Sequence, residues 1–486
     1  MLTQILNPDS IHKDVVICTV PWVDSVIPLM APATLKSVVE QTGRSCLTLD
    51  FNIEVVNFTT KHQHKDQFIK FFFDGVCHAD IEDEVFNLLH NMAKQILSHT
   101  PEWVGLSLFS YVCQHSARWL CYFLKKLNPD IKIIVGGPGC LNTFTGASPY
   151  IDELLAQGLI NYHIRGDGEI SLIQLLDGNV NYPGINSLEW QELTKDELAS
   201  LPIPNYDDYK FDRYETPALP IIGSRGCVRQ CTFCDYIANW PHFNWRKAKD
   251  IFAEMLTQNQ KYHLNFFRFQ DSLTNGNMKE FNHLMELMAE HNTQNPTNLF
   301  RWAGYFIFRD PTPSSDREWE MISQSGAQSL IVGIENLNQH IRFAIGKKFT
   351  NDAIIYHLQK AKQYGITCAL LNIVGYINEK RADIDYIKQW LTDNTEFKDN
   401  ILFQWGGTLG IFPNTFLDKN KKELGITMLA SSPHQWISIH STSTPAERAS
   451  WAKEIQEHSK QLGYRVIDSL DNQFILDQLL NEYHGT

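Results

Sequence analysis

Residues 223–234 read Gly-Ser-Arg-Gly-Cys-Val-Arg-Gln-Cys-Thr-Phe-Cys and follow an apolar stretch at 219–222 that is typical of a short buried strand. The three cysteines, Cys227, Cys231 and Cys234, are spaced Cys-x3-Cys-x2-Cys. Thiolates are soft ligands that suit iron–sulfur clusters and zinc, and a four-iron cluster usually takes four cysteines. Because no fourth cysteine is nearby, the spacing indicates a cluster with one iron open to a substrate or cofactor.

Two other uses of these cysteines compete with a cluster. Cys231 and Cys234 would form half of a zinc site, but such a site needs a second Cys or His pair at comparable spacing. Ten cysteines in 486 residues are too sparse for a disulfide framework. No second Cys-x2-Cys pair occurs among the remaining cysteines, which are Cys18, Cys46, Cys77, Cys113, Cys121, Cys140 and Cys368.

The cysteine triplet resembles the signature of the radical S-adenosylmethionine (SAM) enzymes, including the aromatic residue before the last cysteine, Phe233. The resemblance implies that the three cysteines hold a [4Fe-4S] cluster and that SAM chelates its fourth iron. Electron transfer from the cluster then cleaves SAM to methionine and a 5′-deoxyadenosyl radical. The resemblance also implies an electron donor such as flavodoxin or ferredoxin.

Composition limits the partners that we expect. The net charge is −13, from 42 basic and 55 acidic residues, and no basic stripe of the kind found in nucleic-acid binders is visible. The N-terminus has no basic region followed by a long apolar run, and no stretch approaches the ~18 apolar residues of a transmembrane helix. We therefore expect a cytoplasmic protein that acts on a small-molecule substrate and binds neither nucleic acid nor membrane.

The first part of the chain alternates strand-like and helix-like segments. Strand-like runs lie at 14–22, 45–50, 103–108, 132–137 and around 162–165. This alternation predicts an α/β fold with a doubly wound, Rossmann-like parallel sheet, whose ligands bind outside the carboxyl ends of the strands. The candidate ligand-binding positions at those ends are Trp22, Asp50, Ser107, Gly136 and Gly137.

Three stretches resemble the cobalamin-binding domain that precedes the radical SAM domain in one large subgroup. They are Leu-Asp-Phe-Asn at 49–52, Val-Gly-Gly-Pro at 135–138 and Arg-Gly-Asp-Gly-Glu at 165–169, which contains Gly166. The resemblance implies that cobalamin binds here. The alternative is that the glycines only form tight turns in a ligand-free domain. Many cobalamin proteins ligate cobalt from an Asp-x-His-x-x-Gly loop; the sequence lacks one, as many members of the subgroup do, and no cobalt ligand is assigned.

A proline-rich connector at 175–220 marks a domain boundary. Six strand-like segments follow, and they match the partial (βα)6 TIM-type barrel that the resemblance implies. The segments are Leu219–Ser224, Phe266–Gln270, Phe300–Phe306, Ser329–Ile334, Cys368–Val374 and Ile401–Leu409. The predicted organisation is a cobalamin-binding-like Rossmann domain over 1–178, a linker over 179–218, a radical SAM barrel over 219–420 and a helical C-terminal extension over 421–486.

Candidate SAM contacts lie at the ends of the barrel strands. Asp271 follows the second strand, where the resemblance implies a carboxylate for the SAM amino group and where helix capping is the alternative. Glu335 ends an apolar strand in which an unpaired carboxylate is costly. Tyr305, on the third strand, is a candidate contact for SAM or substrate, or else a core aromatic. The fifth strand end resembles the adenine-contacting element of the family, at Asn372, Val374 and Gly375.

Together these features favour a cobalamin-dependent radical SAM enzyme that methylates an unactivated carbon. The resemblance implies two SAM molecules, one that methylates reduced cobalamin and one that yields the radical. The substrate radical then takes the methyl group from methylcobalamin. The alternatives are a radical SAM enzyme that rearranges, cyclises or contracts its substrate, with or without cobalamin, and a non-enzymatic iron–sulfur protein. No catalytic side chain is assigned.

Overall fold

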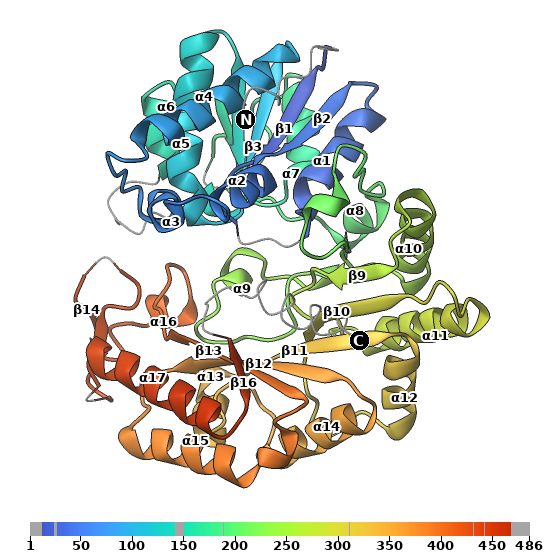
Figure 1. Ribbon diagram of the computed structural model, residues 1–486, viewed down its shortest axis with the longest axis vertical. Coiled ribbons are helices and arrows are strands. Elements are labelled where there is room, and N and C mark those ends of the chain that lie inside the picture. The colour runs from blue at the N-terminus through green and yellow to red at the C-terminus, as the bar shows by residue number, and fades with distance from the viewer. Residues whose placement is uncertain are drawn as a thin grey trace. The chain divides into compact units, whose positions relative to one another are not determined.

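The computed structural model divides into two compact units after Glu215 (Figure 1). Each unit has its own parallel sheet, so the α/β class predicted from the sequence is confirmed. The structure describes residues 12–23, 27–140, 150–187, 189–310, 312–430, 432–441 and 443–467.

The first unit is built on a five-stranded parallel sheet in the order β2-β1-β3-β4-β5. The chain therefore changes direction across the sheet between β1 and β3, and ligands of doubly wound sheets bind beside such a switch point. The strands are β1 (Val15–Thr19), β2 (Cys46–Asp50), β3 (Trp103–Ser107), β4 (Lys132–Gly136) and β5 (Tyr162–Ile164).

Helices cover both faces of this sheet. Along β1, Val16 and Cys18 point into one core, and Val15 and Ile17 point into the other. Strands buried on both faces are typical of parallel sheets. The helices are α1 (Met30–Gln41), α2 (Phe51–Thr59), α3 (Lys65–Asp74), α4 (Glu82–Ser98), α5 (Gln114–Leu127), α6 (Tyr150–Ala156), α7 (Gly168–Leu176) and α8 (Lys195–Ser200).

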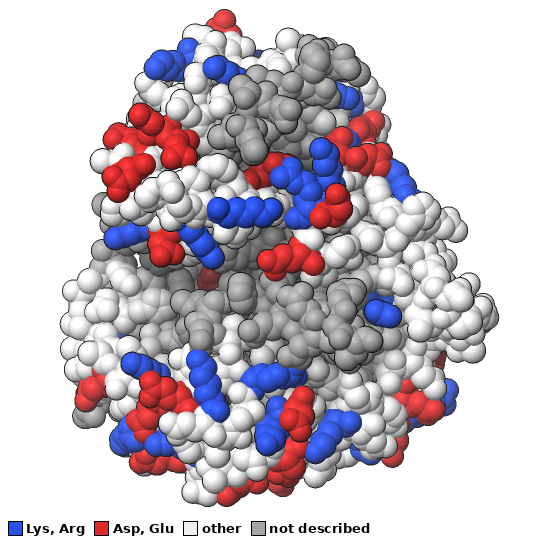
Figure 2. All heavy atoms as spheres, in the orientation of Figure 1, with Lys and Arg blue, Asp and Glu red and all other residues white. Residues whose placement is uncertain are grey.

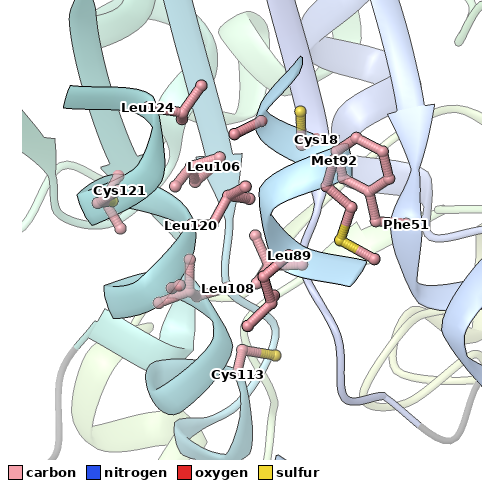
Figure 3. Close-up of a cluster of buried hydrophobic side chains, with 14 of the residues drawn as sticks. Cys18, Phe51, Leu89, Met92, Leu106, Leu108, Cys113, Leu120, Cys121 and Leu124 are labelled. Carbon is pink, nitrogen blue, oxygen red and sulfur yellow. The ribbon is translucent and has the colours of Figure 1, made fainter. Parts of the chain in front are cut away.

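The larger core of this unit lies between the sheet and helices α4 and α5. Figure 3 shows Leu106 of β3 beside Leu89 of α4 and Leu120 of α5, all of them buried. Cys113 and Cys121 belong to the same apolar cluster. These two cysteines therefore act as small hydrophobic residues.

Residues 179–215 pack against the first unit. Asp208 forms an ion pair with Lys36 and accepts hydrogen bonds from both the backbone nitrogen (2.8 Å) and the hydroxyl (3.0 Å) of Thr48. Asn205 Nδ2 donates to Glu40 Oε2 over 2.8 Å. These contacts fix the segment on α1 and β2.

The second unit has a seven-stranded parallel sheet whose strand order follows the chain. Six of its strands correspond to those predicted from the sequence, and the C-terminal region adds β16 beside β13. The strands are β6 (Leu219–Ile221), β9 (Phe266–Phe269), β10 (Arg301–Phe306), β11 (Ala327–Glu335), β12 (Thr367–Val374), β13 (Ile401–Thr408) and β16 (Arg465–Ile467).

Most of the helices of the second unit connect successive strands of the sheet. They are α9 (Tyr236–Asn239), α10 (Ala248–Tyr262), α11 (Met278–Gln294), α12 (Asp316–Gln324), α13 (Gln339–Ile345), α14 (Asn351–Gln363), α15 (Arg381–Asp393), α16 (Phe416–Lys419) and α17 (Pro445–Gln461). Two short antiparallel pairs complete the unit, β7 (Ser224–Arg225) with β8 (Asn244–Trp245) and β14 (Ile426–Met428) with β15 (Trp436–Ser438).

The C-terminal region contains the expected helix, α17, which packs against β12, β13 and β16. It also contains strands β14, β15 and β16, which the helical pattern of the sequence did not predict. Residues 468–486 of the predicted extension lie outside the described residues.

Acidic and basic side chains are interspersed on the face that Figure 2 draws. Among the helices that the structure describes, none is both long and apolar enough to cross a membrane.

Candidate functional site

The three cysteines lie on one loop, residues 226–235, which we call the cysteine loop. It begins at Gly226, whose φ is +78° and where a Cβ would lie 1.9 Å from the carbonyl oxygen of His242. Only glycine tolerates both that conformation and that approach. Farther along, the backbone nitrogen of Cys234 donates to the carbonyl of Cys231 over 3.1 Å.

The thiols suit a cluster better than a single metal ion. Cys231 interacts electrostatically with both Cys227 and Cys234, so the three are neighbours. Burial raises the pKa of Cys231 to about 11 and that of Cys234 to about 12, whereas metal coordination holds a thiol deprotonated. Within the described part of the chain, no three His, Cys, Asp or Glu side chains form a site for one ion. A four-iron cluster instead takes each thiolate on a separate iron.

The end of α13 and Tyr376 hold the cysteine loop from behind. The backbone nitrogen of Thr232 donates to Ile345 O over 2.9 Å, and the Thr232 hydroxyl lies 2.8 Å from the hydroxyl of Tyr376. The Tyr376 hydroxyl also donates to Ala344 O over 3.1 Å. Tyr376 therefore joins the loop to α13 through one buried hydroxyl.

A cavity of about 680 Å³ opens beside this contact. Thr232, Ala344 and Tyr376 line one part of it, and Phe416 and Leu417 line another. The cavity gives small solutes a route to the outer side of the cysteine loop.

Phe233, predicted to accompany the cluster, is half-buried and packs against an apolar group behind the loop. That group includes Ile341 and Ile345 of α13, and Leu417 of α16. The aromatic ring thus anchors the loop in the core of the second unit.

Glu335 and Lys347 form an ion pair near the thiols. Glu335 ends β11 with a φ of +63°, is 8% exposed, and lies 3.2 Å from Lys347 Nζ through Oε1. Burial opposes the charge of Lys347, but Glu335 and the thiols of Cys231 and Cys227 outweigh it and raise the pKa of Lys347. Lys347 therefore places a positive charge beside two of the three candidate cluster ligands.

Asp271 follows β9 and is 2% exposed. Its carboxylate accepts hydrogen bonds from the backbone nitrogen of Gly223 (2.9 Å) and from Ser224 Oγ (2.5 Å), just before the cysteine loop. Burial raises the pKa of Asp271 to about 6, against the opposing effect of these hydrogen bonds. These two bonds support the segment before the loop, and the predicted contact of Asp271 with SAM stays a prediction.

The end of β12 forms a tight turn held by Glu379. This carboxylate is fully buried and accepts hydrogen bonds from the backbone nitrogens of Gly375 and Tyr376 and from Asn336 Nδ2. Burial raises its pKa to about 7. Gly375 has a φ of +84°, and a Cβ there would lie 2.1 Å from Arg448 Cδ.

Residues 221–391 match the family model described as the Radical SAM superfamily. The chain contains a radical SAM domain. The matched segment runs from β6 to α15 and includes the cysteine loop, so the implied cofactors of this domain are a [4Fe-4S] cluster and SAM.

The chain is also similar in sequence to named proteins of other organisms. An uncharacterized methyltransferase of Pyrococcus horikoshii is 22% identical over 327 residues, which cover 63% of this chain and 66% of the relative. An anaerobic magnesium-protoporphyrin IX monomethyl ester cyclase of Synechocystis is 20% identical over 371 residues, which cover 72% of this chain and 66% of the relative. The matches thus span slightly less than two thirds of each relative.

The fold is also similar to that of the radical SAM methyltransferase TsrM from Kitasatospora setae, whose structure contains cobalamin and a [4Fe-4S] cluster. The TM-score is 0.63 at 15% identity, over 90% of this chain and 81% of that chain. At this identity the likeness extends to the fold.

Asn372 provides an unsatisfied acceptor at the predicted adenine-contacting strand end of this radical SAM domain. Its Nδ2 donates to Leu370 O over 2.9 Å, but its buried Oδ1 has no partner among the described residues. A buried acceptor without a donor suits a ligand N–H group. Val374 is fully buried in the same strand, and Tyr305 on β10 is half-buried; their predicted contacts with SAM stay predictions.

In the first unit, the side chains predicted at the strand ends have structural partners. Trp22 is 5% exposed and packs on Phe72, with the ring centroids 5.8 Å apart. Asp50 caps α2 by accepting a hydrogen bond from Ile53 N and also accepts one from the hydroxyl of Tyr214. Both residues are therefore built into the fold, and their predicted cobalamin contacts stay predictions.

The glycines of the first unit allow close backbone packing. A Cβ on Gly137 would lie 2.4 Å from Leu108 O, and one on Gly166 would lie 2.0 Å from Gln191 O; both glycines have positive φ. Gly136 and Ser107 are half-buried at the ends of β4 and β3. These close approaches explain why glycine stands at 137 and 166, and the predicted cobalamin contacts of the glycines and of Ser107 stay predictions.

Sequence reasoning missed Tyr376, Glu379 and the pairing of Lys347 with Glu335. Glu379 stands shortly before α15, where an acidic residue is ordinary at a helix N-terminus. Tyr376 follows a strand and gives no polar signal of its own. Their roles follow only from the tertiary contacts that bring α13 and the cysteine loop together.

Proposed function

We propose that this radical SAM enzyme uses cobalamin and transfers a methyl group to carbon of a small-molecule substrate. The observation that carries the proposal is the order of its parts: a five-stranded sheet of order 2-1-3-4-5 precedes the radical SAM barrel. The TsrM fold, which holds cobalamin in its own structure, covers 90% of this chain. A relative named as a methyltransferase supports the same choice of reaction.

Cobalamin would bind at the carboxyl edge of the first sheet, near the switch point between β1 and β3. The loop after β3 exposes two aromatic side chains there, Phe109 (47% exposed) and Tyr111 (41% exposed). Exposed rings at a strand edge suit a large, largely apolar macrocycle. Gly137 lets the β4 turn lie against Leu108 and keeps this edge free of further side chains.

The cluster, once bound by Cys227, Cys231 and Cys234, supplies the electron that cleaves SAM. The protein contributes position and charge. Tyr376 and α13 fix the cysteine loop, and the positive charge of Lys347 lies near the thiols. Asn372 Oδ1 offers an acceptor to the nucleoside part of SAM. A flavodoxin or ferredoxin is the proposed electron donor.

A second candidate function is radical chemistry without methyl transfer. The relative from Synechocystis is named as a cyclase, which favours this possibility. The two reactions differ in their SAM products. Methyl transfer gives S-adenosylhomocysteine together with 5′-deoxyadenosine, whereas cyclisation or rearrangement gives 5′-deoxyadenosine without S-adenosylhomocysteine.

The test is anaerobic reconstitution with iron, sulfide and cobalamin, followed by gel filtration and product analysis after addition of SAM and dithionite. We expect about one retained cobalamin per chain and formation of both SAM products. 5′-Deoxyadenosine without retained cobalamin would move the assignment to the second candidate.

Two cysteine variants control the experiment. Cys231→Ala should abolish the visible cluster absorbance and SAM cleavage. Cys368→Ala removes a buried cysteine on β12 and should leave both in place. Cleavage of SAM by Cys231→Ala would contradict the cluster assignment.

A further inference from the structure

Arg268 is a buried arginine in the interior of the barrel. It lies on β9 between Phe267 and Phe269, which pack against Phe300 and Trp302 on the helix-covered face. Because successive side chains of a strand point to opposite faces, Arg268 points to the inner face. Its guanidinium carbon lies 5.4 Å from the ring of Tyr305, and 4% of the residue is exposed.

The hydrogen bonds of Arg268 leave most of its donors unused. Nη1 donates to Phe269 O over 2.8 Å and to Ala303 O over 3.5 Å. Nε is buried without an acceptor among the described residues, and Nη2 makes no hydrogen bond to any of them. No carboxylate of the described residues lies at ion-pair distance from Arg268. The nearby carboxylate of Asp271 accepts hydrogen bonds from Gly223 N and Ser224 Oγ instead. A guanidinium has five N–H donors and is costly to bury without an anionic partner.

The other fully or nearly buried arginines either make three or more hydrogen bonds within the protein or pair with an acid. Arg342 donates to Phe349 O, to Asn336 O and to Asn351 Oδ1, at 2.6 to 2.8 Å. Arg448 donates to three backbone carbonyls and lies 3.8 Å above the ring of Trp436. Arg246 pairs with Glu254 at 2.7 Å. Arg268 thus has fewer partners than these three arginines, although Nε of Arg448 also lacks an acceptor among the described residues.

The inner face near Arg268 contains partly exposed residues. On the inner face, Tyr305, Gly333 and Leu371 are each partly exposed, although their strand neighbours on the helix-covered face are buried. Tyr305 and Leu371 pack against an apolar floor that contains Ile331, Ala369 and Leu402. The inner face therefore carries a buried guanidinium beside Tyr305, which packs on this apolar group and is itself partly exposed.

We propose that Arg268 binds an anionic group of the substrate, a carboxylate, phosphate or phosphonate, inside the barrel. An oxyanion would accept from Nε and Nη2 as a bidentate partner, and its charge would balance the buried guanidinium. The proposal rests on the proposed function for the identity of the barrel as the reaction chamber. SAM is the other source of a carboxylate, since the electrostatic partners of Arg268, Tyr305 and Asp271, are themselves candidate SAM contacts. The SAM affinity of the Arg268 variant separates the two sources.

The test measures anion binding directly, with Arg268→Met as the main variant. The cluster-reconstituted protein is heated in sodium phosphate and in sodium chloride of equal ionic strength, and SAM affinity is measured by equilibrium dialysis. We expect phosphate to raise the melting temperature of the wild type and not that of Arg268→Met. Loss of a charge-assisted contact corresponds to roughly 10- to 100-fold weaker phosphate binding.

Stability separates an anion site from a structural arginine. Arg268→Met should melt at or above the wild-type temperature in chloride, because it removes a buried charge that lacks an acidic partner. Arg342→Met is the matched control and should melt several degrees lower, since it breaks hydrogen bonds that are all made within the protein. Neither variant should change the affinity for SAM.

Three results would overturn the proposal. They are a phosphate response that Arg268→Met retains, a melting temperature that falls as far as that of Arg342→Met, and a loss of SAM affinity. The last result would assign Arg268 to SAM. Failure of the proposed function looks different, because it would appear as missing cobalamin or missing SAM products with the phosphate response intact.

Discussion

Replacing Tyr376 by phenylalanine tests whether the hydroxyl behind the cysteine loop controls cluster retention. The change removes the hydroxyl that bonds to Thr232 (2.8 Å) and Ala344 (3.1 Å) and keeps the ring in its apolar surroundings. Each of the two bonds contributes about 0.5–1.5 kcal/mol. Because Thr232 keeps its backbone bond to Ile345, we expect a net loss of about 1–2 kcal/mol in the free energy that holds the loop closed.

That loss raises the population of the open loop by roughly 5- to 30-fold, since 1.4 kcal/mol corresponds to a factor of ten. The assay follows the visible absorbance of the reconstituted cluster under nitrogen after addition of a ferrous chelator, which can reach the loop through the adjoining cavity. When opening and closing are fast relative to chelation, the rate of iron loss follows the open population. We expect Tyr376→Phe to lose its cluster roughly 5- to 30-fold faster than the wild type.

The matched control is Tyr356→Phe. Tyr356 lies on α14, and its hydroxyl donates to Ser314 O over 2.8 Å. Removing this hydroxyl therefore breaks a similar hydrogen bond in another part of the unit. The control should lose iron at the wild-type rate. Equal rates for wild type, Tyr376→Phe and Tyr356→Phe would refute the assignment of Tyr376 as the residue that fixes the loop.

Three further predictions address charge, proton binding and backbone packing. Lys347→Met should make the cluster reduction potential more negative in an EPR-monitored redox titration, because it removes a positive charge beside two thiols. The control is Lys348→Met, which changes an exposed neighbour and should leave the potential unchanged. Burial raises the pKa of Asp271 from 3.8 to about 6. The protonated carboxyl therefore contributes its full stability below pH ~4, and the free energy of unfolding falls by about 3 kcal/mol as the pH rises through about 6. Asp271→Asn should remove that part of the pH dependence of the melting temperature; an unchanged slope would show that the carboxyl is not responsible. Gly137→Ala should destabilise the first unit by about 1–3 kcal/mol in urea unfolding, whereas Gly43→Ala, with positive φ but no atom within 4 Å of the added Cβ, should cost less. Equal losses for the two glycine variants would contradict the steric argument.

The sequence predicted what local patterns encode. The Cys-x3-Cys-x2-Cys spacing and the alternation of strands and helices led to the cysteine loop and to both parallel sheets. It did not predict β16, because Arg465–Ile467 is only three residues long and directly follows the turn after α17. The sequence also did not reveal the partners Gly223 of Asp271 and Thr232 of Tyr376, since they lie 48 and 144 residues away in the chain. Arg268, in the run Phe-Arg-Phe-Gln, could have been a surface residue of an edge strand; only its place on the inner face of the barrel makes it unusual.

The two edge strands of the second sheet are β6, from the start of the unit, and β16, from near its end. Both are three residues long, and Pro220 at the centre of β6 has no N–H to offer to another strand. A short edge that contains proline is a poor template for strand addition from a second chain. An open barrel can thus keep its interior accessible without exposing long edges that promote aggregation. Lengthening β6 or replacing Pro220 would weaken that protection without touching any residue of the site.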